Sequence, residues 1–238
     1  MKRVLVLVAV GCACVAAVWL AGVLLVPVPL PSNPTRPTPP VDIAALRSRA
    51  EGGDAPAQAQ LAGLYARGDG ATNSYAEAAT WFRKAADQTN AQAQLGLGEL
   101  YEAGQGVPKD MPQALKLYRA AAEQGLAKAQ YTLGFMCESG RGVPVDQTQA
   151  AKWFRLAAEQ GEPLSQYDLG QRYDLGVGVP VDHIEAYKWL ALAAAQGQND
   201  ARDRLETVRK NLSRAQIAEA QARVSAISSK SPNSAHSP

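Results

Sequence analysis

Cysteine and histidine are scarce in this chain, and neither residue forms a cluster. Only three of the 238 residues are cysteine and two are histidine. Cys12 and Cys14 lie in an apolar N-terminal stretch, and Cys137 stands alone in the rest of the sequence. A lone thiol cannot build an intramolecular disulfide framework, and no pair has the spacing of metal ligands. The sequence therefore predicts a fold stabilised by packing, with no metal site and no cofactor.

An excess of charge of either sign is also absent. The chain has 24 Lys and Arg against 22 Asp and Glu, for a net charge of +2, and no dense basic stripe. Proteins that bind nucleic acid neutralise phosphates with clustered basic side chains. We therefore expect no nucleic-acid ligand.

The one long apolar run lies at the N-terminus. Lys2 and Arg3 precede Val4 to Val26, a stretch without any charged residue. A helix of that length reaches ~34 Å and crosses a ~30 Å hydrocarbon core. Cleavable signal peptides normally have apolar regions of only about 7–15 residues. We therefore favour an uncleaved transmembrane anchor over residues 1–26, with cleavage or lipidation before Cys12 as the alternative.

The positive charges before this run set its expected orientation. Basic residues stay on the cytoplasmic side of a membrane. The sequence thus predicts a single-pass membrane protein whose remaining chain lies on the extracytoplasmic, periplasmic side. Residues 27–41 are rich in proline, which fixes φ and removes backbone donors, and they form an extended linker. Residues 228–238, SSKSPNSAHSP, are predicted to be a disordered tail.

Residues 42–227 are periodic, with a spacing of 36 residues. Glutamine, leucine and small residues return in register: Gln58, Gln94, Gln130 and Gln166; Leu61, Leu97, Leu133 and Leu169; Ala62, Gly98, Gly134 and Gly170. A glycine pair follows each time: Gly68 and Gly70, Gly104 and Gly106, Gly140 and Gly142, Gly176 and Gly178. Recurrence without insertion or deletion is typical of repeat architectures. We place the units at about 57–92, 93–128, 129–164 and 165–200.

Each unit is predicted to form two helices. Ala93, Leu97 and Leu100 share one face of a first helix, which the glycine pair ends. An N-cap residue then begins a second helix; these caps are Ser74, Asp110, Asp146 and Asp182. The second helix is expected to bury an alanine column and a column of large residues, namely Trp81, Leu117, Trp153 and Trp189.

Glycine inside the first helices indicates close packing of helices. A glycine there costs roughly 0.5–1 kcal/mol relative to alanine, so its return at Gly98, Gly134 and Gly170 implies a compensating contact. We expect Gly134 to lie in the packing contact between the second and third units, so that Gly134→Leu would disrupt their stacking. Stacked helix pairs predict an all-α fold, a right-handed α/α solenoid of four repeats preceded by one transmembrane helix.

A C-terminal cap is expected over residues 201–227. Residues 201–210 begin a degenerate first helix, and Ser213 with Gln216 forms a capping box that opens a final helix. Arg214, Glu219 and Arg223 are expected to face outward from it.

These residues resemble the Sel-one-like repeat (SLR) family, a relative of the tetratricopeptide repeat. The pattern is Ala-Gln-x-x-Leu-Gly-x-x-Tyr-x-x-Gly-x-Gly-Val, then Asp-x-x-x-Ala-x-x-Trp-x-x-x-Ala-Ala-x-x-Gly, over about residues 57–197. Unit one departs from it after Gly70, and unit three has Cys137 in place of tyrosine. The resemblance implies an adaptor that holds partner proteins or peptides on the concave side of a solenoid.

No residue pattern points to catalysis. Asp168 and Asp174 are expected to be solvated, His183 has no second histidine or cysteine nearby, and Cys137 lacks the partners of a nucleophile. We therefore predict a non-enzymatic protein. Two alternatives are a cell-envelope factor that binds peptidoglycan and a β-lactamase-like hydrolase. The cysteine-rich relatives of the second kind carry a cysteine pair in every repeat, which is absent here.

The predicted partner-binding face lies on the first helices, opposite the packing columns. Its residues vary between units, as an open surface permits. They are Gln60, Arg67, Glu99, Thr132, Phe135, Ser139, Asp168, Gln171 and Leu175.

Overall fold

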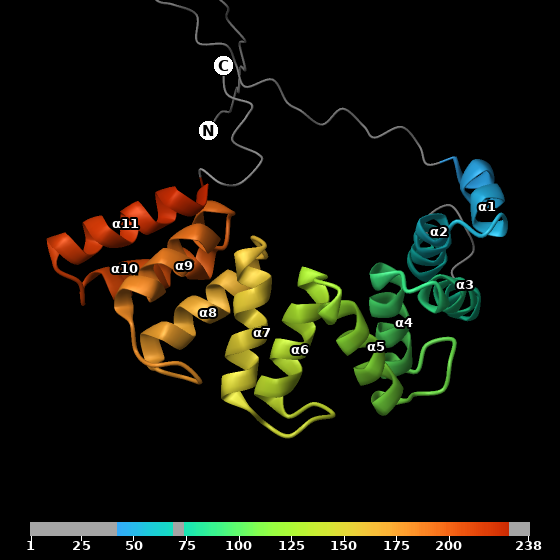
Figure 1. Cartoon of the computed structure of the whole chain (residues 1–238), viewed down its shortest axis with the longest axis horizontal. Helices are drawn as coiled ribbons and strands as arrows, with labels where there is room; N and C mark the ends of the chain where they lie inside the picture. The colour runs from blue at the N-terminus through green and yellow to red at the C-terminus, as the bar shows by residue number, and fades with distance from the viewer. Residues whose placement is uncertain (1–41, 69–73, 229–238) are drawn as a thin grey trace, which may run out of the picture. The chain divides into compact units, whose positions relative to one another are not determined.

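The computed structural model describes residues 42–68 and 74–228, and the regular structure within them is helical (Figure 1). Eleven helices and no strand occur in these ranges: α1 (Ile43–Glu51), α2 (Ala55–Arg67), α3 (Tyr75–Asp87), α4 (Ala91–Ala103), α5 (Met111–Glu123), α6 (Ala127–Ser139), α7 (Gln147–Glu159), α8 (Pro163–Leu175), α9 (His183–Ala195), α10 (Asn199–Arg209) and α11 (Arg214–Ser228). None of these helices is long and apolar enough to cross a membrane. The expected anchor, linker and tail (residues 229–238) lie outside the described residues.

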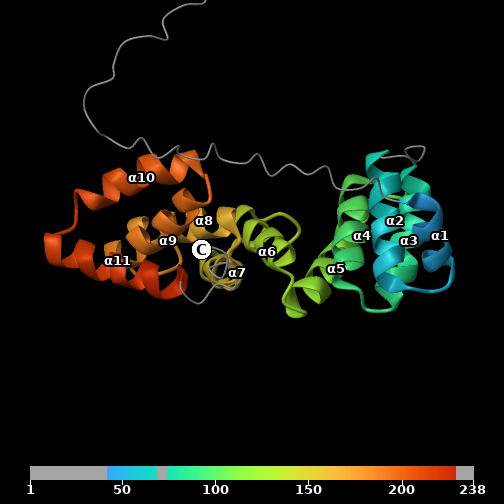
Figure 2. The same cartoon turned by 90° about the horizontal axis from the view of Figure 1, so that it is seen from above.

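Helices α2 to α9 form four pairs, each with a first helix and a second helix. The members of a pair pack together, and each second helix also packs against the first helix of the next pair (Figures 1 and 2). The predicted solenoid of helix-pair repeats is thus confirmed. The first helices begin at Ala55, Ala91, Ala127 and Pro163, slightly before the predicted unit limits.

The expected local signals end and begin the helices. Gly68, Gly104, Gly140 and Gly176 are the C-caps of the first helices. Their φ angles of 70° to 75° belong to the left-handed region that glycine adopts without strain. Each second helix begins at its predicted cap, whose side chain accepts a hydrogen bond from a backbone N–H of the first turn.

In the second and fourth units, the second glycine of the pair has a separate role. A Cβ atom added to Gly178 would lie 2.0 Å from the backbone oxygen of Gln147, and one added to Gly106 would lie 2.3 Å from that of Tyr75. Both contacts join a loop to the beginning of the second helix in the preceding pair. This glycine therefore allows consecutive units to approach backbone to backbone, which the sequence analysis did not predict.

The glycines inside the first helices also permit close packing, but within a pair. A Cβ atom at Gly134 would lie 2.7 Å from the Phe154 ring, in the second helix of the same pair. Gly98 meets Tyr118 and Gly170 meets Leu190 in the same way. The expectation that Gly134 lies in the contact between the second and third units was therefore wrong. Gly96 of α4, by contrast, makes its close contact across pairs, with Phe82 of α3.

These contacts identify the large core residues of the second helices. The buried column is Phe82, Tyr118, Phe154 and Leu190, each directly after a residue of the predicted column. Trp81, Leu117 and Trp153 are only half-buried, so the predicted column is wrong for three units; Trp189 is buried. One residue rotates a helical side chain by about 100°, enough to exchange a core position for a boundary position.

Each repeated glutamine is buried and is hydrogen bonded to the amide of an exposed glutamine 30 residues later. Gln58 accepts a hydrogen bond from Gln88 at 2.8 Å and donates to the Ala50 carbonyl at 3.0 Å. The same amide–amide bond recurs within each of the other units: Gln94 with Gln124, Gln130 with Gln160, and Gln166 with Gln196. A buried amide is costly without hydrogen-bond partners, so these paired positions explain why glutamine recurs.

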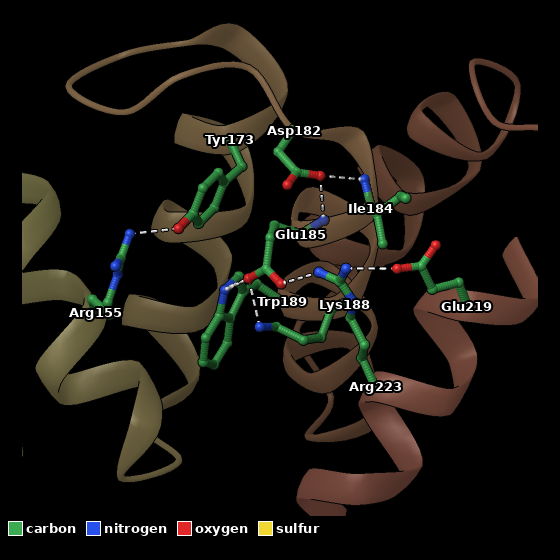
Figure 3. Close-up of polar contacts among 9 residues, drawn as sticks. All are labelled: Arg155, Tyr173, Asp182, Ile184, Glu185, Lys188, Trp189, Glu219 and Arg223. Carbon is green, nitrogen blue, oxygen red and sulfur yellow. Dashed lines mark hydrogen bonds and ion pairs between the residues drawn. The ribbon is translucent and has the colours of Figure 1, made fainter. Parts of the chain in front are cut away.

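Helices α10 and α11 close the C-terminal end of the stack on α9. The Ser213 hydroxyl accepts from Gln216 N, and the Gln216 side chain accepts from Ser213 N, which confirms the capping box. Arg223 does not simply face outward: it donates to Glu185 of α9 at 2.6 Å (Figure 3). Glu185 also accepts from the Trp189 indole at 3.2 Å, so this carboxylate joins the cap to the last repeat.

Candidate partner-binding surface

The first helices present one continuous row of surface positions, which we call the first-helix face. Helix α2 contacts α4 directly, and Lys128 of α6 reaches Glu99 of α4, with 3.0 Å between Nζ and Oε1. The nine predicted site residues all lie on α2, α4, α6 and α8.

An open groove of about 540 Å³ occupies the N-terminal part of this face. Leu64, Phe82 and Leu95 are buried residues that line it, together with Gly63 and Gly96, and the Phe82 ring lies against Gly96. Three predicted residues lie at this groove: Gln60, Arg67 and Glu99. The combination of an apolar interior and polar edges is typical of binding sites.

The other six predicted residues lie outside the groove. Phe135 and Leu175 are exposed apolar side chains, at 41% and 59%. The Thr132 and Ser139 hydroxyls donate to the Lys128 and Phe135 carbonyls of their own helix, while Asp168 and Gln171 are half-buried. The structure therefore divides the predicted face into a hollow part on α2 and α4 and a filled part on α6 and α8.

The position beside Phe135 on the following first helix, α8, also holds an apolar residue, Leu164. One repeat earlier, the same two positions hold Glu99 and Lys128, which form an ion pair. In the following unit they hold Phe135 and Leu164, which are 41% and 43% exposed. An exposed ion pair is thus replaced by two exposed apolar side chains.

Asp168 lies one turn from Leu164, beside Tyr131 of α6. Its side chain is hydrogen bonded to Tyr131, and it is not the freely solvated charge that the sequence suggested. Burial and the nearby Glu138 carboxylate raise the pKa of Asp168 to about 6, although Arg172 acts in the opposite direction. Burial likewise raises the pKa of Tyr131 to about 12.

The helix-pair units match a known family. Residues 55–90, 91–126, 127–162 and 163–198 each match the Sel1 repeat. The chain belongs to the Sel1 repeat family. This confirms the resemblance, and Sel1 repeat proteins generally serve as scaffolds for protein–protein interaction.

Two solved structures are similar to this Sel1 repeat chain. The first is c5321, a protective antigen in uropathogenic Escherichia coli strains that displays an SLR fold, with 42% identity and a TM-score of 0.65. The second is a Sel1 repeat protein from Oxalobacter formigenes, with 36% identity and a TM-score of 0.66. The matches cover 69% and 70% of this chain but 35% and 48% of those chains. No curated protein matches the chain.

Two charged side chains of the Sel1 repeats are largely buried and ion-paired. Asp174 is an ion-pair partner rather than a solvated charge, with 2.6 Å to Arg204 and 3.2 Å between its Oδ1 and His183 Nδ1. Arg172 is 3% exposed at the position that holds Leu64 in the first unit, and it pairs with Glu138 at 2.6 Å. Both pairs join neighbouring elements of the stack.

The tyrosines at equivalent positions of the Sel1 repeats accept hydrogen bonds from arginines at equivalent positions. Arg47 donates to the Tyr65 hydroxyl at 2.7 Å and Arg83 to that of Tyr101 at 3.0 Å. In the third repeat Cys137 occupies the tyrosine position and is half-buried. Burial and Asp146 raise the pKa of the Cys137 thiol, which disfavours the reactive thiolate. In the described ranges no group of His, Cys, Asp and Glu could hold a metal ion.

Proposed function

We propose that the protein is a non-enzymatic scaffold that binds partner proteins or peptides on its first-helix face. The observation that carries this proposal is the exposed pair Phe135 and Leu164, at positions where the preceding unit has an ion pair. Neither side chain is needed in the core, because Leu133 and Met136 of α6 and Leu169 of α8 already supply buried contacts. Aromatic side chains of this kind often act as anchors of protein interfaces.

The groove on α2 and α4 extends the proposed surface. It offers apolar residues between polar edges, and the Glu99–Lys128 ion pair forms its edge toward α6. A partner segment along this face would therefore contact the apolar groove, then the ion pair at its edge, and then the exposed Phe135 side chain. Several contacts with different chemistry favour specificity for one partner sequence.

Replacing Phe135 with alanine is expected to weaken partner binding by about 1–3 kcal/mol. The free energy of unfolding should change by about 1 kcal/mol or less, since the ring is not part of the core. The partner would be captured from native membranes with the full chain in detergent and identified by mass spectrometry. Its affinity for wild type and variant would then be measured by calorimetry.

Leu156→Ala is the matched control for this experiment. Leu156 is also apolar and 44% exposed, but it lies on a second helix, α7. The control should bind the partner like wild type. Equal binding by Phe135→Ala, or a loss that only Leu156→Ala causes, would remove the first-helix face from the function.

We further propose that residues 1–26 anchor this scaffold in the membrane, with the repeats on the extracytoplasmic, periplasmic side. The proposal is supported by Val4 to Val26, which carry no charge, and by the preceding Lys2 and Arg3. The proline-rich residues 27–41 would then separate the repeats from the bilayer.

A C-terminal reporter fused to the full chain should be active only outside the cytoplasm. Periplasmic alkaline phosphatase activity and membrane fractionation together measure this. Substituting two arginines for Val15 and Ala16, near the middle of the span, should release the protein from the membrane fraction, because charge at the centre of an apolar span is costly. Reporter activity confined to the cytoplasm would contradict the proposed topology.

A further inference from the structure

We propose that the first-helix face selects a partner segment in which a lysine or arginine stands next to a large apolar side chain. The site is a cluster of four residues on two helices, Tyr131 and Phe135 of α6 with Leu164 and Asp168 of α8, which we call the α6–α8 patch. This inference rests on the proposed function and adds the chemistry of the partner.

The helical period and the repeat symmetry together place the four side chains in one cluster. Tyr131 and Phe135 are one turn apart on α6, and Leu164 and Asp168 are one turn apart on α8. The hydrogen bond between Tyr131 and Asp168 joins the two helices on one side. Phe135 and Leu164 occupy the positions at which the preceding repeat forms its ion pair, so they are neighbours on the other side.

The apolar half of the patch is exposed without a covering element. Phe135 is 41% and Leu164 is 43% exposed, and no described helix packs over them. A partner side chain such as leucine or phenylalanine would remove both from water. Burial of apolar surface favours such binding in proportion to the area covered.

The polar half of the patch has one carboxylate, that of Asp168, and the Glu162 carboxylate is close enough to raise its pKa. Asp168 has no ion pair among the described residues, and the Glu162 carboxylate accepts from backbone N–H groups at the start of α8. The nearby basic side chains are already paired: Lys128 with Glu99, Arg172 with Glu138, and Arg204 with Asp174. Charge complementarity therefore calls for a cation from the partner.

The environment of Asp168 adds support to this geometry. Burial and the Glu138 and Glu162 carboxylates raise its pKa to about 6, so its charged form is poorly compensated within the protein. A partner ammonium or guanidinium group beside Asp168 would supply the missing counter-charge. An acidic partner segment would instead add a further negative charge and be rejected.

The test uses the full chain in detergent and a random-sequence peptide library displayed on phage. Selected peptides should be enriched in a basic residue next to Leu, Phe or Trp. The best peptide and its Lys→Glu version would be fluorescently labelled and titrated by anisotropy. We expect the basic peptide to bind at least about tenfold more tightly than the acidic one.

Variants separate the two halves of the patch. Asp168→Asn keeps a hydrogen-bonding group for Tyr131 and should reduce the preference for the basic peptide about tenfold, while Glu159→Gln on α7 should leave it unchanged. Phe135→Ala and Leu164→Ala should weaken both peptides. Circular dichroism would verify that each variant is folded.

The outcomes distinguish this inference from the function on which it rests. Enrichment of acidic or uncharged peptides whose binding still requires Phe135 would overturn the cation selectivity and leave the proposed surface standing. Equal preference in Asp168→Asn and wild type would also overturn the inference. The absence of any selected peptide, or binding indifferent to Phe135 and Leu164, would contradict both.

Discussion

Replacing Gly178 with alanine is expected to destabilise the repeat region by about 3–5 kcal/mol, combining backbone strain with overpacking. Its φ of 72° lies in the left-handed region, and the added Cβ would lie 2.0 Å from the Gln147 carbonyl oxygen and 2.5 Å from its carbon. Both atoms belong to the backbone at the start of α7, so no side chain can move aside. Thermal and urea unfolding followed by circular dichroism would measure the loss.

Gly161→Ala isolates the effect of this close approach. Gly161 also has a positive φ, of 88°, but no atom lies within 4 Å of its added Cβ. Its replacement should cost only the backbone strain, about 1–2 kcal/mol. Equal losses for the two variants would mean that the loop of the fourth repeat does not touch α7 closely.

Replacing Phe154 with alanine should cost about 3–5 kcal/mol, the usual range for removing a buried phenylalanine. Phe154 is fully buried, packs against Gly134 and lies 5.6 Å from the Tyr131 ring between centroids. Gly134 cannot extend into the cavity, because it has no side chain. Chemical denaturation would give the change in the free energy of unfolding.

Leu156→Ala in the same helix provides the comparison. Leu156 is 44% exposed, so its truncation should cost about 1 kcal/mol or less. A similar loss at both positions would contradict the assignment of Phe154 to the core. A large loss for Trp153→Ala together with a small one for Phe154→Ala would restore the tryptophan column that the sequence suggested.

The sequence predicts most of the fold because the decisive signals are local. Asp110, Asp146 and Asp182 cap helices within a few residues, and the first glycine of each pair ends a helix through its own φ. The second glycine has no such signal. Gly178 is needed because of the Gln147 backbone, a contact that depends on how consecutive units stack.

The core column shows a second limit of pattern reading. Trp153 and Phe154 are adjacent and both recur as large residues, so periodicity alone cannot say which one is buried. The answer depends on Gly134 of the facing helix, which accepts the Phe154 ring. Arg172 is a similar case, because its burial follows from Glu138, a partner on the preceding first helix.

The candidate surface is predictable only in part. The helical period places Phe135 away from the packing face of α6, and its side chain is indeed exposed. Leu164 was missed because its relation to Phe135 runs between two helices rather than along one. The raised pKa of Asp168 was missed for the same reason, since the carboxylate of Glu138 belongs to α6.

Site-specific photocross-linking tests the proposed scaffold most directly. A photoreactive amino acid would replace Phe135, and in a second variant Leu156, in the full chain within native membranes. We expect a partner protein to be cross-linked from position 135 and not from position 156. Cross-links from position 156 alone, or from neither position, would contradict partner binding on the first-helix face.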